Sequence, residues 1–269
     1  MLVLDYKSSP VSCNSLGNIA AQMLAVEWLR QRGENVCVIP SDFHRDVWMM
    51  LPHAIWDGLP CKNSVVVVPQ PRLHERVANG LSWIETAIVE AGAEGDSFSL
   101  TPDVIWTHDA NSRNVLIYPR EHDNANAVFD LDWWVICCRE MIRCGAKIMA
   151  IFEQGNNARD VAERGYTSDF ARAFLERVPV TMVLPSTIGG IQAGAGLCRL
   201  AVGRFTGPGW LLLKSSIRQI ALDSVNDFPF CKVSYHVSRG VLGKGIAVCD
   251  NTEMTKVLSL VSDLLGEKK

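Results

Sequence analysis

The segment VGRFTGPGWLLLK, which ends at Lys214, places a Thr-Gly-Pro-Gly turn between two apolar runs. The turn consists of Thr206, Gly207, Pro208 and Gly209. One interpretation is a loop that only connects two buried elements. The other is a turn that opens a helix, because proline is favoured in a first helical turn and the first backbone N–H groups of a helix bind phosphate.

Polar residues in the first half of the chain follow two predicted strands. Ligands of parallel sheets bind beyond the carboxyl ends of the strands, so chemistry is expected in these loops. Asn18 lies at a helix entrance, where it either caps the helix or faces a substrate. Asp42 and His44 follow the strand predicted at 35–39, and His44 could orient a general base there.

Two loops of the second half carry further candidates. Glu153 and Gln154 come just after the apolar run KIMAIF, where they could hold a nucleoside edge or a ribose. An equally weighted interpretation is that both side chains simply face solvent. Ser186 follows the apolar run VTMVL, in a loop that the same rule assigns to the ligand-binding edge.

Several common sites are disfavoured by the motifs. The chain contains no Gly-x-Gly-x-x-Gly at its first strand, no phosphate-binding P-loop and no Gly-x-Ser-x-Gly elbow. Its histidines show no metal-ligand spacing, and no Cys-x-x-Cys pair occurs. Asp130 and Asp132 have a spacing that can hold a divalent metal, yet they open an apolar-periodic segment, which favours helix capping. No metal site is therefore expected.

Composition indicates a globular protein of the cytoplasm. Of the 269 residues, 48% are hydrophobic, which is ample for a buried core. No apolar run is long enough to span a membrane, and the first residues lack a secretion signal pattern. The nine cysteines are odd in number and scattered, as expected for reduced thiols. A net charge of −3 argues against broad binding of nucleic acid or anionic lipid.

Apolar runs alternate with amphipathic segments along the chain, which predicts an α/β fold with parallel sheets. A polar, turn-rich stretch at 107–114 divides the pattern into two Rossmann-like domains in tandem, 1–107 and 108–269, with a cleft between them. The predicted strands are 2–6, 35–39, 64–68, 103–106, 115–119, 147–152, 180–184, 199–203, 218–222 and 231–237. The predicted helices are 15–33, 74–92, 130–145, 168–178, 186–196, 207–215 and 251–269.

Three stretches together resemble the GT-B-fold glycosyltransferases of the heptosyltransferase type, glycosyltransferase family 9. The opening SLGNIAAQMLAVEWLRQRGENVCVI is similar to that family's Leu-Gly-Asp turn with its helix and second strand. The stretch from VLIYPREH to KIMAIF is similar to the strand, loop and Trp-containing helix that follow the hinge. The most specific stretch, STIGGIQAGAGLCRLAVGRFTGPGWLLL, is similar to the family's helix and strand leading into Asp-Thr-Gly-Pro-Met-His-Leu.

The resemblance implies an activity and a division of labour. The second domain would bind a nucleoside-diphosphate sugar as co-substrate, with the 206–209 amides on the diphosphate and Arg120 or Lys214 supplying a cation. The first domain would present an acceptor hydroxyl of a glycan, a lipid-linked sugar or a modified DNA base. Neither a metal nor another cofactor is implied.

The chain departs from the family pattern at three positions. Asn18 stands where the family has a catalytic Asp, Phe205 replaces the Asp before Thr-Gly-Pro, and Trp210 replaces the His after it. Either another group such as Asp42 acts as base, or the acceptor has changed, or activity is lost. The alternatives are thus a nucleotide- or sugar-binding protein of this fold without catalysis, and an enzyme of the nucleotide-sugar epimerase or phosphate-ester hydrolase type.

Overall fold

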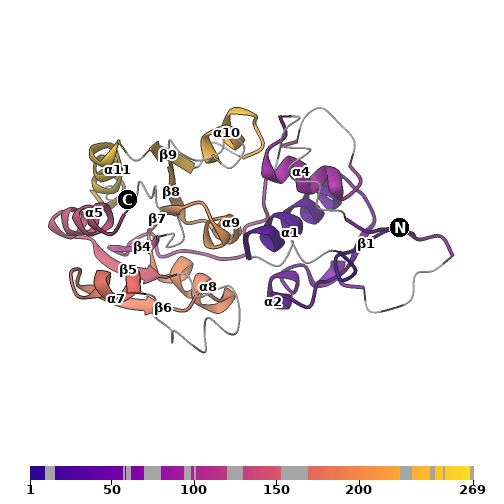
Figure 1. Ribbon diagram of the computed structural model, residues 1–269, viewed down its shortest axis with the longest axis horizontal. Coiled ribbons are helices and arrows are strands. Elements are labelled where there is room, and N and C mark those ends of the chain that lie inside the picture. Colours follow the sequence, from indigo (N-terminus) through magenta and orange to yellow (C-terminus); the bar gives the residue numbers. More distant parts are fainter. Residues whose placement is uncertain are drawn as a thin grey trace. The chain divides into compact units, whose positions relative to one another are not determined.

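The computed structural model describes residues 1–9, 16–56, 58, 62–69, 80–93, 98–99, 101–119, 130–152, 169–224, 232–242, 246–250 and 252–266 (Figure 1). The chain forms two compact units. Unit 1 consists of Met1–Pro102 and Phe228–Gly243, and unit 2 of Asp103–Asp227 and Lys244–Lys269.

The chain passes between the units three times, after Pro102, Asp227 and Gly243. The sequence predicted a single boundary between residues 107 and 108. The main difference is the segment Phe228–Gly243, which the predicted second domain contains and which the structure assigns to unit 1. Unit 1 is therefore built from two stretches of chain that are far apart in sequence.

Unit 1 contains a parallel sheet of three described strands in the order β2-β1-β3. The strands are β1 (Leu2–Asp5), β2 (Val36–Ile39) and β3 (Val65–Val67). The central strand β1 pairs with both neighbours, and its Val3 and Leu4 are fully buried. The edge strand β3 exposes 63% of Val65.

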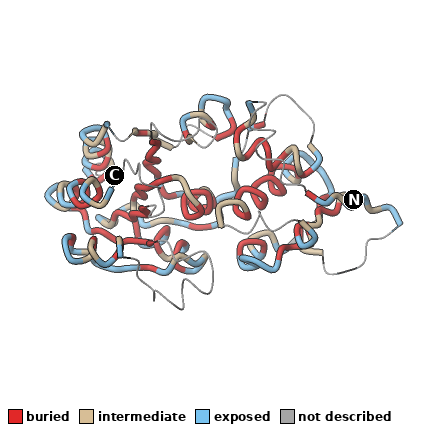
Figure 2. The backbone as a smooth tube through the Cα atoms, viewed as in Figure 1, coloured by how far each residue is buried: buried red, intermediate tan, exposed pale blue. Residues whose placement is uncertain are grey.

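The described helices of unit 1 are α1 (Leu16–Gln31), α2 (Arg45–Trp48), the 3₁₀ turn η2 (Pro52–Ala54), α4 (Trp83–Glu90) and α10 (Val233–Ser238). Helix α1 packs against β2 and against α2 and α4. Every residue of α1 from Ile19 to Leu29 is buried, as Figure 2 shows. Two residues after the helix ends, Gly33 has a φ of 87°, a left-handed conformation that glycine adopts easily. This confirms the predicted C-cap.

Unit 2 contains a parallel sheet of six described strands in the order β6-β5-β4-β7-β8-β9. In chain order the strands are β4 (Asn114–Tyr118), β5 (Lys147–Ile151), β6 (Val180–Leu184), β7 (Leu200–Arg204), β8 (Arg218–Asp223) and β9 (Ile246–Asp250). The helices are α5 (Leu131–Arg143), α7 (Asp169–Leu175), α8 (Ile188–Leu197), α9 (Gly207–Leu212) and α11 (Met254–Gly266).

The main core of unit 2 lies between one face of its sheet and the helices α5, α7 and α11. Trp134 of α5 and Phe174 of α7 are fully buried there, with Val202 of β7 and Val257 of α11. None of the described helices combines the length and the apolar character that crossing a membrane requires.

Two predicted elements of the chain are corrected by the structure. The strand predicted at 231–237 is wrong, because its described part forms α10. Val233 and His236, three residues apart, are the buried positions of that helix, although the valines at 233 and 237 alternate with polar residues as in a strand. In the strand predicted at 103–106, only Trp106 pairs, in an isolated bridge with Ser215.

Candidate functional site

The sheet of unit 2 has a topological switch point between β4 and β7. From β4 the chain builds outward to β5 and β6, then returns to the other side of β4 with β7. Ligands of open parallel sheets bind in the crevice that such a reversal opens at the carboxyl ends of the strands. The turn that contains Thr206 to Gly209 follows β7 directly and so lies at this point.

The turn opens a helix, as the second interpretation of the sequence predicted. Thr206 is the N-cap of α9, and Pro208 lies in its first turn. The first i→i−4 hydrogen bond of the helix runs from Trp210 N to Thr206 O, at 3.0 Å. The N–H groups of Gly207 and Gly209 precede that bond and have no i−4 partner within the helix. The backbone therefore offers two donors at the positive end of a short helix.

Aromatic packing fixes the position of this turn. The Tyr118 ring at the end of β4 lies so close to β7 that a Cβ on Gly203 would come within 2.3 Å of it. The Tyr118 hydroxyl lies 3.2 Å from Gln219 Oε1, and burial raises the pKa of this phenol above its ordinary value. On the other side of the turn, the Phe205 and Trp210 rings meet edge to face, with centroids 4.4 Å apart. The two departures from the family pattern thus pack against each other.

The remaining candidates of unit 2 are distributed differently. Ser186 is half-buried directly before Thr187, the N-cap of α8, and three strand spacings separate β6 from β7, or about 14 Å. Lys214 is only 1% exposed, and its carbonyl accepts hydrogen bonds from Ile105 and Trp106. The ligand contacts predicted for both residues stay predictions. Arg120, Glu153 and Gln154 lie outside the described residues.

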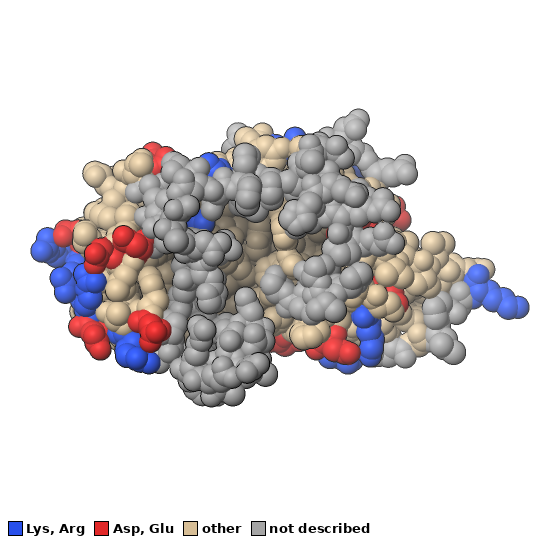
Figure 3. Space-filling model, in the orientation of Figure 1, with Lys and Arg blue, Asp and Glu red and all other residues tan. Residues whose placement is uncertain are grey.

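The Asp-x-Asp pair acts as the capping interpretation predicted. Asp130 is the N-cap of α5 and accepts from Trp133 N at 2.8 Å. Asp132 pairs instead with Arg177, at 2.6 Å. Figure 3 shows basic and acidic side chains interspersed at the end of unit 2 that carries α5 and α7. Within the described part of the chain, no group of three His, Cys, Asp or Glu residues is arranged to hold a metal ion.

Unit 1 has a switch point of its own, between β1 and β3. The loops after these two strands are joined there by the Ser9 hydroxyl, which donates to the Pro69 carbonyl at 2.7 Å. Asn18 lies in the first turn of α1, the helix that follows β1, and is half-buried. The structure therefore places this candidate at the carboxyl edge of the first sheet.

Asp42 and His44 follow β2, as predicted, but they have different partners. Asp42 is exposed and forms an ion pair with Lys7 at 3.4 Å. Desolvation lowers the pKa of His44, and the carboxylate that opposes this effect is Asp46. His44 also has a φ of 47°, the one left-handed residue other than glycine in the described part of the chain. The general-base role of the pair stays a prediction.

No family model matches the sequence, and no curated protein matches it. Solved structures do match over nearly the whole chain. E. coli heptosyltransferase WaaC with ADP gives a TM-score of 0.57 at 14% identity, covering 98% of this chain and 100% of that one. The same enzyme with ADP-2-deoxy-2-fluoro heptose gives 0.53 at 13% identity, covering 97% and 99%.

A third match is a family 9 glycosyltransferase from Veillonella parvula, with a TM-score of 0.52, 11% identity and coverage of 96% of this chain and 88% of that one. The predicted fold class, two α/β units with parallel sheets, is confirmed by these matches and by the sheets themselves. The chain therefore shares the fold of these heptosyltransferase and family 9 glycosyltransferase structures.

Proposed function

We propose that the protein transfers a sugar from a nucleoside-diphosphate sugar to an acceptor hydroxyl. The observation that carries the proposal is the fold match along almost the entire chain to a heptosyltransferase. Two of the matching structures hold ADP or an ADP-sugar analogue, which supports a nucleotide-sugar as the donor. The turn after β7, at the switch point of the second sheet, supports the same donor chemistry independently.

The proposed reaction is a displacement at the anomeric carbon of the sugar. The acceptor oxygen forms a bond to that carbon while the bond to the diphosphate breaks, and the acceptor proton passes to a base. Negative charge develops on the leaving diphosphate. The N–H groups of Gly207 and Gly209 would stabilise it, with Arg120 as the proposed cation.

The base is the weakest point of the resemblance. Asn18 carries an amide, which does not accept a proton at neutral pH, where the heptosyltransferase pattern has an Asp. Asp42 is the proposed substitute, because its carboxylate follows β2 at the carboxyl edge of the first sheet and is exposed. Its partner Lys7 is also exposed, so the ion pair is screened by solvent and leaves the carboxylate accessible.

A nucleotide-binding protein without transfer activity is the second candidate. Three observations favour it: the amide at Asn18, and the Phe205 and Trp210 rings packed together where the resemblance has an acid and a histidine. Such a protein would bind nucleotide-sugars and release no nucleoside diphosphate. Turnover of a nucleotide-sugar without any acceptor would instead favour an epimerase or hydrolase.

If the chain has lost its base, as the second candidate holds, the replacement Asn18→Asp is expected to raise turnover about 100-fold, the usual contribution of a general base. If Asp42 already serves as the base, the same replacement should change turnover little. An acid in the first turn of α1 also interacts favourably with the helix dipole, so the fold should tolerate it. The measurement is release of nucleoside diphosphate from ADP-, UDP- and GDP-sugars, with a lipid-linked oligosaccharide fraction as acceptor. Asn18→Ala is the control without an ionisable group. Equal rates in both variants would contradict a catalytic position at residue 18.

A further inference from the structure

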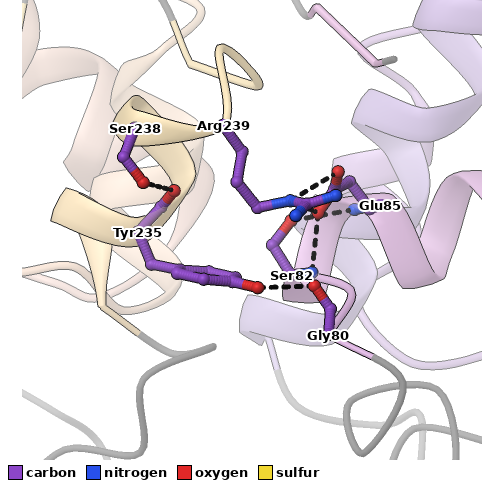
Figure 4. Close-up of polar contacts among 6 residues, drawn as sticks. All are labelled: Gly80, Ser82, Glu85, Tyr235, Ser238 and Arg239. Atoms are coloured by element: carbon purple, nitrogen blue, oxygen red, sulfur yellow. Dashed lines mark hydrogen bonds and ion pairs between the residues drawn. The ribbon is translucent and has the colours of Figure 1, made fainter. Parts of the chain in front are cut away.

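The second stretch of unit 1 is attached to the first by polar contacts between α10 and the start of α4 (Figure 4). Arg239, which follows α10, donates from its Nε to both carboxylate oxygens of Glu85, at 2.8 and 2.7 Å. The Tyr235 hydroxyl donates to the carbonyl of Gly80. These contacts join residues more than 150 positions apart in the sequence.

Glu85 is almost completely buried, and its carboxylate has two tasks. It accepts from Ser82 N at 2.7 Å, which completes the capping box of α4, and it binds Arg239. Burial raises the pKa of Glu85, but the hydrogen bonds from Arg239 and Ser82 outweigh this effect and lower it. The carboxylate is therefore charged at neutral pH, and Arg239 is its counterion.

Arg239 differs from Glu85 in its access to water, because 34% of its side chain is exposed. The ion pair is thus open to solvent from one side only. If the pair breaks while the segment stays docked, Arg239 regains water, whereas Glu85 stays buried and loses its counterion. An uncompensated buried charge is strongly unfavourable, so the contact is a strong constraint while it is closed.

Helix α10 is too short to be stable without its contacts to the rest of unit 1. α10 has only six residues, and isolated helices of that length are not stable in water. Its buried contacts come from Val233 and His236, with Val241 and Leu242 directly after it. The order of the segment 232–242 therefore depends on its docking to unit 1.

We propose that the Glu85–Arg239 pair is a latch that holds α10 on unit 1, and that opening it releases the segment 232–242 as one piece. With the latch closed, three covalent crossings connect the two units. With it open, only the crossing after Pro102 leads directly into unit 1. The latch is thus a conformational device built into the fold, and it does not depend on the proposed transferase activity.

The test is hydrogen exchange of the segment 232–242, measured by mass spectrometry on the full chain. Arg239→Gln should accelerate exchange there by at least about tenfold, because it leaves Glu85 charged and buried. Glu85→Gln should have a smaller effect, since the amide oxygen can still accept from Ser82 N and Arg239 is partly solvated. The double variant Glu85→Gln/Arg239→Gln should recover protection relative to Arg239→Gln alone, because no buried charge remains.

Two controls distinguish release of the segment from unfolding and from the loss of an ordinary ion pair. Exchange in β1 and α1, which belong to unit 1, reports whether a variant has unfolded that unit as a whole. Arg172→Gln breaks an ion pair with Asp169 on the surface of unit 2 and should change nothing in 232–242. If Arg239→Gln exchanges no faster than Arg172→Gln, or if the double variant exchanges as fast as Arg239→Gln, the latch is overturned.

The pH dependence of docking gives a second test of the latch, because His236 of α10 is fully buried and must lose or gain its proton there. Burial lowers the pKa of His236 from 6.5 to about 4, while the Glu85 carboxylate raises it and Arg239 lowers it. The released histidine regains its ordinary pKa and binds more protons, so docking weakens as the pH falls from 6.5 towards 4. Release at pH 5 should be favoured up to roughly thirtyfold, after correction for intrinsic exchange rates. The same weakening in His236→Leu would contradict this role.

Discussion

Replacing Gly190 by alanine is expected to destabilise unit 2 by about 3 kcal/mol, whereas the same change at the neighbouring Gly189 should stabilise it by up to about 1 kcal/mol. Both glycines lie in the first turn of α8. A Cβ on Gly190 would come within 2.0 Å of the Pro185 carbonyl oxygen, a backbone atom that cannot move aside cheaply. A Cβ on Gly189 meets nothing within 4 Å, so alanine there gains its helix propensity without a clash.

Thermal unfolding of the two variants measures this difference directly. Each kcal/mol shifts the midpoint of a domain of this size by about 2–4 °C, so Gly190→Ala should fall by roughly 6 °C or more. The pair is closely matched, because the substitution, the helix and the turn are the same. Equal midpoints for the two variants would contradict the packing of α8 on the loop after β6.

Gly203→Ala is expected to cost about 3 kcal/mol as well, by overpacking the centre of the second sheet. A Cβ at this position of β7 would lie 2.3 to 2.5 Å from three atoms of the Tyr118 ring. That ring is 1% exposed and its hydroxyl pairs with Gln219, so it has no open space to enter. It also lies 3.3 Å from the position that a Cβ on Gly209 would occupy, so its displacement would disturb the turn that opens α9.

A double-mutant cycle identifies the ring as the cause. Tyr118→Leu alone loses packing and the contact with Gln219, but it also vacates the space that the new methyl group needs. The loss in the double variant should therefore be smaller than the sum of the two single losses by at least about 1 kcal/mol, measured by chemical denaturation. Additive losses would show that Gly203 is constrained by something other than Tyr118.

Local signals made much of the fold predictable. Gly33 ends α1, Asp130 caps α5, and Pro208 opens α9, each as the residue type and its place at the edge of an apolar pattern indicated. Each of these signals is a local conformational preference of a few residues. The preferred conformations occur in the structure because the tertiary contacts favour the same conformations. The alternation of strands and helices then predicts parallel sheets without knowledge of their strand order.

The features that sequence reasoning missed depend on distant contacts. The segment 231–237 was predicted as a strand, whereas the structure has a helix there that docks against Glu85, 154 positions before Arg239. One available signal was overlooked: Ser82 and Glu85 have the Ser-x-x-Glu spacing of a capping box, which marks the true start of α4. The return of the chain to unit 1 has no comparable local signature.

In the candidate site too, the local features were predictable and the features that depend on distant residues were not. The turn at Thr206 was found because glycine tolerates turn conformations and proline fixes φ wherever they occur in a sequence. Its location at a switch point follows from the strand order, which is a property of the sheet and not of the turn. The pairing of Asp42 with Lys7 was missed because the two residues follow different strands, β2 and β1.

The central claim is that the turn after β7 binds the diphosphate of a nucleotide-sugar, and a thermal-shift series tests it most directly. The wild-type chain, Gly207→Asp and its uncharged counterpart Gly207→Asn are each heated with ADP, UDP, GDP and their sugars. A ligand at a hundredfold excess over its dissociation constant stabilises by about 2.7 kcal/mol, which shifts the midpoint by several degrees. The account predicts this shift with one nucleotide series, retained in Gly207→Asn and lost in Gly207→Asp. No shift with any nucleotide, or an equal shift in both variants, would contradict a diphosphate site at this turn.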